Sequence, residues 1–176
     1  MYKGHDRKHN RWLGYDYSIP GHYFITNCTQ NRVCHFGEVV DGKMVLNELG
    51  KIVQDFWQQI SKHFNNCKLD EFIVMPNHVH GIIEIFYDFD YLTVGNADLR
   101  SLQRTKMLVP KIIHGFKSSA TREINKKQDE IYFQWQKSYH DRVIRNEKEL
   151  IDKRYYIQQN PSQWAEDSNN PINIKL

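Results

Sequence analysis

The chain has 176 residues and a mass of 21.1 kDa, a size that fits a single domain. Hydrophobic residues make up 40% and charged residues 26%, which excludes a disordered chain and supplies enough apolar material for a core. There is no apolar run of membrane-spanning length, no secretory signal at the start and no Cys-x-x-Cys pair among the three cysteines. We therefore expect a cytoplasmic protein with no membrane partner and no disulfide scaffold.

The net charge is only +3, but the positive charges are clustered in two runs. Residues 104–127 include seven basic side chains, opposed by Glu123 alone, and Lys117 and Arg122 lie in this run. Each run is either a solvated surface or a set of phosphate contacts, and composition alone does not decide between them. The basic residues of the other run, at the start of the chain, are Lys3, Arg7, Lys8 and Arg11.

The first third of the chain predicts a strand, a hairpin and a helix. Residues 22–29 are aromatic and β-branched and follow Pro20-Gly21, which indicates a strand. Asp41-Gly42 separates two short apolar runs and predicts a two-residue hairpin turn. Apolar residues then recur every four positions over residues 50–64, and Asn47 can cap this helix.

The middle of the chain predicts two adjacent strands and a long helix. Residues 68–75 and 78–86 form the strands, which Pro76-Asn77 interrupts. Residues 87–107 have no clear period, so we expect a loop or insertion there. A helix is predicted from Val109-Pro110 to about Asn125.

The last third predicts one or two strands within residues 131–145 and a final helix. Asn146 followed by Glu149 is typical of a capping box, and the helix should end before Pro161. Parallel neighbouring strands need a crossover connection, usually a helix, and this chain has too few predicted helices to connect all of its strands in that way. We therefore predict an α+β fold in which helices pack on one face of an antiparallel sheet.

The sequence His78-Val79-His80 is the first chemical signal. Side chains alternate along a strand, so both imidazoles project from one face while Val79 enters the other. Two neighbouring imidazoles suit a divalent metal ion. A His-x-His pair also arises by chance in a chain with nine histidines, but two ionisable residues on one face of an apolar strand must meet water, a partner or a site.

Tyr156 and Asn160 are the second signal, because four residues separate them on the predicted last helix and they share a face. Tyr155 is an equally good nucleophile by composition, but it points about 100° away. Only Tyr156 shares its face with Asn160, whose amide oxygen is suited to a hard metal ion.

Taken in order, these motifs resemble the HUH single-strand transposases, and most closely the REP-associated tyrosine transposases. The resemblance covers residues 23–164. It rests on the run from Pro76 to Gly81, the helix at 111–124 and the run from Ser138 to Pro161. The basic start and the segment 87–107 depart from the family pattern.

The resemblance implies a ferredoxin-like sheet with the two histidines at its centre. It also implies that His78, His80 and Asn160 hold Mg²⁺ or Mn²⁺ and that Tyr156 attacks a phosphodiester to form a 5′-phosphotyrosine. The implied partner is single-stranded or hairpin DNA. The ending Tyr-Ile-x-x-Asn-Pro favours the monomeric branch of the family over the branch with a helix-swapped homodimer.

We expect a basic tail at 1–20, a catalytic domain at 21–165 containing the segment 87–107, and a C-terminal tail at 166–176. Two other functions stay open: a non-catalytic nucleic-acid-binding ferredoxin-like module, and a domesticated nuclease that no longer transposes. Lys153, almost one turn before Tyr156, is a further candidate for DNA contact. The complete set of candidate DNA-binding residues is Lys3, Arg7, Lys8, Arg11, Lys117, Arg122 and Lys153.

Overall fold

The structure is a computed structural model that describes residues 16–17, 19–86, 108–127 and 132–173. The predicted loop or insertion at 87–107 lies outside the described residues. The four basic residues of the N-terminal run, Lys3, Arg7, Lys8 and Arg11, also lie outside them.

Four strands form one antiparallel sheet in the order β4-β5-β1-β6. They are β1 (Gly21–Cys28), β4 (Cys67–Met75), β5 (His78–Ile85) and β6 (His140–Ile144). Helices connect β1 to β4 and β5 to β6, which is the ferredoxin-like arrangement. The predicted α+β class and the antiparallel sheet are confirmed.

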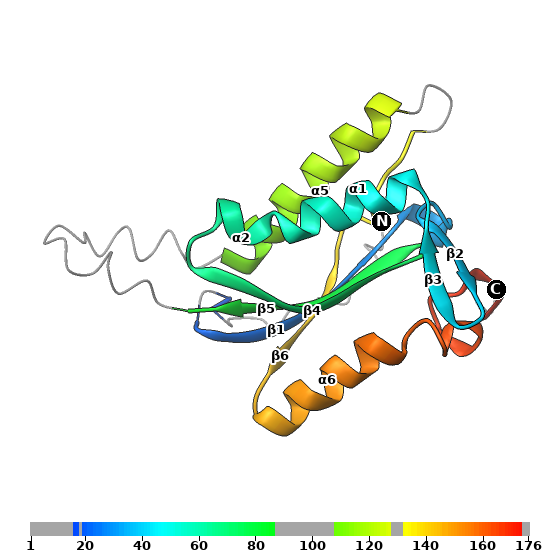
Figure 1. Cartoon of the computed structure of the whole chain (residues 1–176). Coiled ribbons are helices and arrows are strands. Elements are labelled where there is room, and N and C mark those ends of the chain that lie inside the picture. Colours follow the sequence, from blue (N-terminus) through cyan, green and yellow to red (C-terminus); the bar gives the residue numbers. More distant parts are fainter. Residues whose placement is uncertain (1–15, 18, 87–107, 128–131, 174–176) are drawn as a thin grey trace, which may run out of the picture.

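Helices cover both faces of the sheet (Figure 1). On one side lie α1 (Glu48–Gln58), the single turn α2 (Ile60–His63) and α5 (Leu108–Lys127), with Trp57 and Ile112 fully buried in their core. On the other side lies α6 (Glu147–Gln159). A separate cluster packs under α6 and consists of Phe24, Ile82, Ile144, Leu150 and Ile157.

The prediction that all helices pack on one face is therefore wrong for α6. The physical reason lies in the strands, because Tyr23 and Ile25 point to one face and Phe24 to the other, and all three are buried. A strand that is apolar on both faces needs cover on both.

A second, two-stranded sheet pairs β2 (Gly37–Val40) with β3 (Lys43–Leu46). Its turn confirms the predicted hairpin, since Asp41 and Gly42 have φ angles of 51° and 70°, and a tight hairpin turn of this kind needs positive φ at both central residues. The side chain of Asn47 caps α1 by accepting a hydrogen bond from the Gly50 amide at 2.9 Å. The helix predicted over 50–64 is interrupted at Gln59 and so becomes α1 and α2.

The end of the chain follows the prediction in part. The side chain of Asn146 accepts a hydrogen bond from the Glu149 amide at 2.9 Å and caps α6. The Glu149 carboxylate does not close the capping box, because it accepts from the Arg145 amide at 3.0 Å instead. In the described part of this region, residues 132–145, β6 is the only full strand, and Trp135 makes an isolated bridge to Thr29. After α6 come two short 3₁₀ helices, η2 (Trp164–Glu166) and η3 (Pro171–Asn173).

Candidate active site

His78 and His80 project from β5 onto the face of the sheet that α6 covers. Their cross-strand partners on β1 are Cys28 and Thr26. Both side chains are buried, and their ring centroids are 4.4 Å apart. The same-face placement predicted from strand alternation is confirmed.

The hydrogen bonds of Asn77 determine which nitrogen of His78 is available. The Asn77 Nδ2 atom donates to the carbonyl oxygens of Arg32 and Asn169, each at 2.8 Å, so its Oδ1 atom must accept. His78 Nδ1 lies 2.8 Å from that oxygen and is therefore the protonated nitrogen. The Nε2 atom of His78 therefore carries no proton and has a free lone pair. This atom is buried and has no hydrogen-bond partner among the described residues.

His80 is oriented in a similar way by a side chain on the neighbouring strand. Its Nδ1 atom lies 2.8 Å from Thr26 Oγ1, and its Nε2 atom lies 3.4 Å from the Tyr156 hydroxyl. The Phe24 ring stacks on the imidazole at a centroid distance of 5.3 Å. Histidines that bind metals are commonly oriented by a hydrogen bond to the other ring nitrogen, and both histidines here have one.

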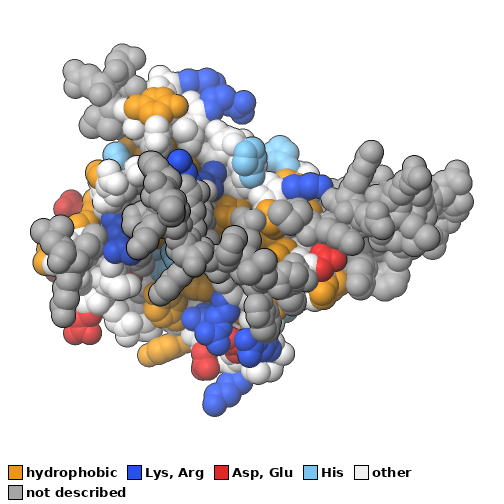
Figure 2. Space-filling view, turned by 180° about the vertical axis from the view of Figure 1, so that it is seen from behind, with side chains coloured by type: hydrophobic (Ala, Val, Ile, Leu, Met, Phe, Trp, Pro, Cys, Tyr) orange, Lys and Arg blue, Asp and Glu red, His pale blue; other side chains and the backbone are white. Residues whose placement is uncertain are grey.

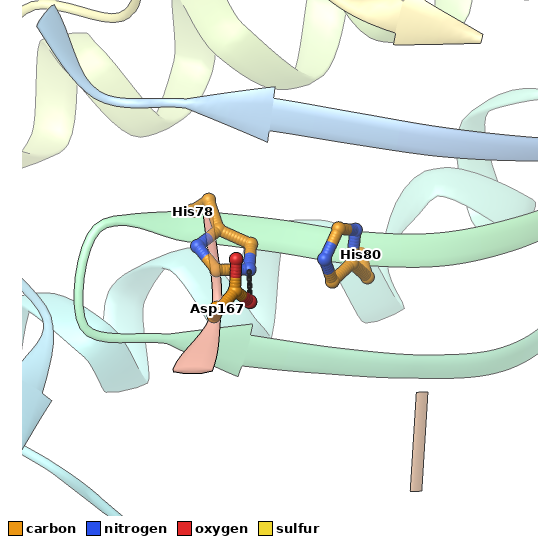
Figure 3. A group of neighbouring side chains, drawn as sticks. All are labelled: His78, His80 and Asp167. Carbon is orange, nitrogen blue, oxygen red and sulfur yellow. Dashed lines mark ion pairs between the residues drawn. The ribbon is translucent and has the colours of Figure 1, made fainter. Parts of the chain in front are cut away.

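Asp167 lies next to the two histidines, and the sequence did not predict it as a site residue. Its Oδ2 atom is 3.9 Å from His78 Nε2, and potential ligand atoms of His78, His80 and Asp167 all lie within 4.8 Å of one another (Figure 3). The carboxylate follows η2, in the segment that the sequence analysis treated as a C-terminal tail. No spacing rule relates an acidic residue in an irregular segment to a distant strand, so the sequence carries no signal for it.

Asn160, the C-cap residue of α6, lies against the same group. Its Nδ2 atom donates to Asp167 Oδ2 at 3.3 Å, while its Oδ1 atom is buried with no hydrogen-bond partner in the described part of the chain. Unpartnered buried polar atoms are uncommon and call for an explanation. Two imidazole nitrogens, a carboxylate and an amide oxygen form a donor set that fits a divalent cation. The group of His78, His80 and Asp167 is therefore able to hold a metal ion.

Burial sets the protonation states of the site. It lowers the pKa of His78 to about 4, despite the opposing charge of Asp167, and holds the pKa of His80 well below its usual value. Both imidazoles are thus neutral at pH 7, which is the form that binds metals. Burial and the Asp167 carboxylate both raise the pKa of Tyr156, so its hydroxyl keeps its proton unless a positive charge assists.

The two adjacent tyrosines point in different directions. The Tyr156 ring is 5.2 Å from the His80 ring and 5.9 Å from the Phe24 ring, between centroids. The Tyr155 side chain is 62% exposed. The structure brings together Tyr156, Asn160 and the two histidines, and it leaves Tyr155 outside the group.

The candidate DNA-binding residues that the structure describes fall in two places. Lys153 lies beside Tyr156 on α6, with its Nζ atom 5.2 Å from the centre of that ring. Lys117 and Arg122 line a groove of about 1080 Å³ between α5 and residues 132–139, on the opposite side of the sheet. Lys117 Nζ donates to the Gln136 carbonyl at 2.6 Å, so it also holds one wall of this groove.

The groove has a strongly positive lining. No aspartate or glutamate lines it among the described residues, whereas five lysine and arginine side chains do: Lys111, Lys117, Arg122, Lys126 and Lys137. Figure 2 shows the molecule from behind, with basic side chains at the top, on the side of α5, and with basic and acidic side chains together at the bottom, on the side of α6. None of the described helices is long and apolar enough to cross a membrane.

Comparisons with known proteins found a relative in sequence and several solved structures of similar fold. No family model matches it. An uncharacterised protein of Haemophilus influenzae is 37% identical over 167 residues, which cover 93% of this chain and 92% of the relative. The structure of a REP-associated tyrosine transposase bound to a REP hairpin aligns with a TM-score of 0.53 and 18% identity, over 88% of this chain and 74% of the other.

A protein of Deinococcus radiodurans that carries the provisional name of transposase aligns with a TM-score of 0.46 and 17% identity, over 85% of this chain and 96% of the other. The predicted structural resemblance to the REP-associated tyrosine transposases is confirmed at the level of the fold. This chain belongs to the same family as the H. influenzae protein.

Proposed function

We propose that this protein is a metal-dependent single-strand DNA endonuclease and strand transferase, a transposase of the REP-associated tyrosine kind. The observation that carries the proposal is the position of the Tyr156 hydroxyl, 3.4 Å from His80 Nε2. It lies at a group of buried ligand atoms that includes His78 and Asp167. A tyrosine hydroxyl beside a candidate metal centre is a known arrangement for nucleophilic attack.

His78, His80 and Asp167 would hold Mg²⁺ or Mn²⁺, and Asn160 would add its free amide oxygen. When bound, such an ion acts as a Lewis acid that neutralises charge on a nonbridging phosphate oxygen. His80 Nε2 is the nitrogen that faces the site, because Thr26 occupies Nδ1. The same lone pair is unable to serve both a metal ion and the proton of Tyr156, so we assign it to the metal ion.

Tyr156 supplies the nucleophile in the proposed reaction. Its oxygen forms a bond to phosphorus, the bond from phosphorus to the 3′ oxygen breaks, and the phenol proton is lost to solvent or a base. The products are a 5′-phosphotyrosine and a 3′ hydroxyl, which takes up a proton. The covalent link conserves the energy of the broken bond, so the reverse attack by a 3′ hydroxyl rejoins DNA without a nucleotide cofactor.

We propose single-stranded DNA with a hairpin as the substrate. The relative in fold was solved bound to a REP hairpin, and the groove along α5 supports a nucleic-acid contact, because it is basic and has no acidic lining residue among those described. Arg122 and Lys117 are its proposed phosphate contacts, and the N-terminal basic residues are proposed as further ones. We also propose that the protein acts as a monomer.

The nucleophile is tested by comparing two single-hydroxyl variants. Tyr156→Phe should eliminate the covalent protein–DNA adduct, because phenylalanine has no oxygen to form the bond. Its cost in stability should be of order 1 kcal/mol, the worth of an ordinary hydrogen bond. Tyr155→Phe is the matched control and should retain the adduct.

The measurement is a denaturing gel with labelled single-stranded hairpin oligonucleotides and Mn²⁺, in which the adduct shifts the protein band. An adduct that persists in Tyr156→Phe and disappears in Tyr155→Phe would exclude Tyr156 as the nucleophile. Absence of an adduct from the unmodified protein across a library of such oligonucleotides would favour the non-catalytic binding module. A domesticated nuclease would form the adduct and rejoin DNA without moving it.

A further inference from the structure

Lys153 lies on the side of α6 that faces the sheet, where Leu150 and Ile157 are buried. Its Nζ atom is 4.7 Å from the centre of the Phe24 ring and 5.2 Å from the centre of the Tyr156 ring. At both distances an ammonium group is attracted to an aromatic face. The positive charge is therefore held next to the tyrosine of the site.

This ammonium group has no anionic partner within the described residues. Among the described residues, neither the ion pairs nor the hydrogen bonds include Lys153. The nearest acidic groups on its own helix are Glu149 and Asp152. Glu149 is already bound by the guanidinium of Arg142 and the amide of Arg145.

The charged groups around Lys153 act in opposite directions, since Arg142 lowers its pKa while Glu149 and Asp152 raise it. Arg142 on β6 lowers the pKa of Lys153, after the larger lowering caused by burial. His80 on β5 is neutral at pH 7 because burial depresses its pKa. A half-buried cation near Arg142 that makes no ion pair with any described residue is stabilised by an anion that binds beside it.

Packing alone gives no reason for a charge at this position. The half-buried Lys153 side chain lies against the Phe24 ring, but a methionine of similar length would occupy that place without the cost of dehydrating an ammonium group. The charge is thus unexplained by the fold of α6.

We propose that Lys153 binds the phosphate that Tyr156 attacks, as the anion-binding residue of the site. The inference rests on the proposed function and names the ligand as a phosphodiester of single-stranded DNA. After the Tyr156 oxygen has bonded to phosphorus, the phosphate stays attached to that ring, so Lys153 contacts it before and after the reaction. The other lysine of α6, Lys148, has no such position, since it is exposed in the first turn of the helix.

The test measures DNA binding in the Tyr156→Phe background, where no cleavage takes place. Lys153→Met removes the charge and keeps the stem, Lys153→Arg keeps the charge, and Lys148→Met is the control on the same helix. The probe is a labelled single-stranded oligonucleotide of random sequence, titrated by fluorescence anisotropy at several salt concentrations.

Lys153→Met should weaken binding about tenfold, as expected for a hydrogen bond to a charged group, and lower the salt slope by roughly 0.7. Lys153→Arg should restore most of the affinity, and Lys148→Met should leave both quantities unchanged. Equal affinities and slopes for the Lys153→Met and Lys148→Met variants would overturn the inference.

A second measurement locates the phosphate. Once adduct formation has identified the cleaved position, an oligonucleotide with an uncharged methylphosphonate there should bind equally well with and without Lys153→Met. A remaining tenfold difference would show that Lys153 contacts some other phosphate and would contradict the proposal. If the unmodified chain forms no adduct while Lys153→Met still loses affinity, the proposed catalysis fails and the anion-binding role stands. If the adduct forms and Lys153→Met binds normally, only the role of Lys153 fails.

Discussion

Two buried polar atoms, Nε2 of His78 and Oδ1 of Asn160, lack hydrogen-bond partners in the described part of the chain. An unpaired buried polar atom costs about 1–3 kcal/mol. Both residues lie against Asp167, whose Oδ2 atom accepts from Asn160 and stands 3.9 Å from His78. A cation at this point would satisfy both lone pairs and the carboxylate, so the same atoms that destabilise the metal-free protein favour the metal-bound one.

At this scale we predict that His78→Ala and His80→Ala each lower the affinity for Mn²⁺ by about 100-fold or more, because each removes a ligand. Val79→Ala, which changes the opposite face of the same strand, is the control and should keep the affinity. Isothermal titration with Mn²⁺ measures the affinity of each of these variants. Wild-type affinity in either histidine variant would refute the metal centre proposed here.

The pH dependence of that affinity follows from the depressed pKa values. Protons compete with a metal ion only below the pKa of the imidazole, and the pKa of His78 is about 4. The affinity should therefore be nearly constant as the pH falls from 8 to 6 in the same titrations. A pair of exposed histidines with ordinary pKa values of about 6.5 would already lose affinity in this range.

At the level of elements, α6 is attached to β4 of its own chain. The Arg154 guanidinium donates two hydrogen bonds to the Asp70 carboxylate, from Nε at 3.0 Å and from Nη2 at 2.7 Å. Gln158 Nε2 also donates to the Glu71 carboxylate at 3.1 Å. The register of β4 shifts between Leu69 and Phe72, and such an irregularity redirects the side chains within it. These contacts, together with the buried cluster under α6, hold Tyr156 at the histidines of the same chain.

We therefore predict that mixing the Tyr156→Phe and His80→Ala variants restores no adduct formation. In a helix-swapped dimer, a mixed pair would contain one site with both the tyrosine and the histidine intact, and activity would return. In a monomer with α6 in cis, every site lacks one or the other. The adduct assay on the mixture measures this, and light scattering should give the mass of one chain, 21.1 kDa. Recovery of the adduct in the mixture would show that the helix is exchanged.

At the scale of the whole molecule, the sheet separates the basic groove along α5 from the lysine beside Tyr156. The Lys153 side of α6 lies on one face, and the α5 groove lies on the other (Figure 1). A DNA molecule that contacts both must pass around the sheet or present two separate segments. A hairpin with a single-stranded extension has two such segments, which agrees with the proposed substrate.

We predict that Arg122→Gln weakens binding of hairpin DNA and lowers its salt slope by about 0.9, the value for one lost phosphate contact on a duplex. The rate of adduct formation at saturating DNA should not change, because Arg122 is on the other side of the sheet from Tyr156. Lys51→Gln, on the exposed surface of α1, is the control. A salt slope identical to that of the control would show that Arg122 makes no phosphate contact and is an ordinary solvated surface residue.

The sequence by itself determined the parts of this protein that depend on local geometry. Strand alternation placed His78 and His80 on one face, and the helical period separated Tyr156 from Tyr155 and grouped it with Asn160. The Asp41-Gly42 turn was equally local, since it depends on two φ angles. Each of these predictions needed only the spacing of residues within one element.

Only the tertiary structure decided which elements meet. Asp167 joins the histidines because the segment after η2 lies beside the turn between β4 and β5, where Asn77 donates to the Asn169 carbonyl, and no periodicity links this segment to β5. The placement of α6 opposite α1 and α5, and of Lys153 over Phe24, likewise depends on how the two faces of the sheet are divided among the helices. Such contacts join residues that are far apart in the chain. They are stabilised by the burial of apolar surface between elements, and the spacing of residues within one element does not show which other element will cover it.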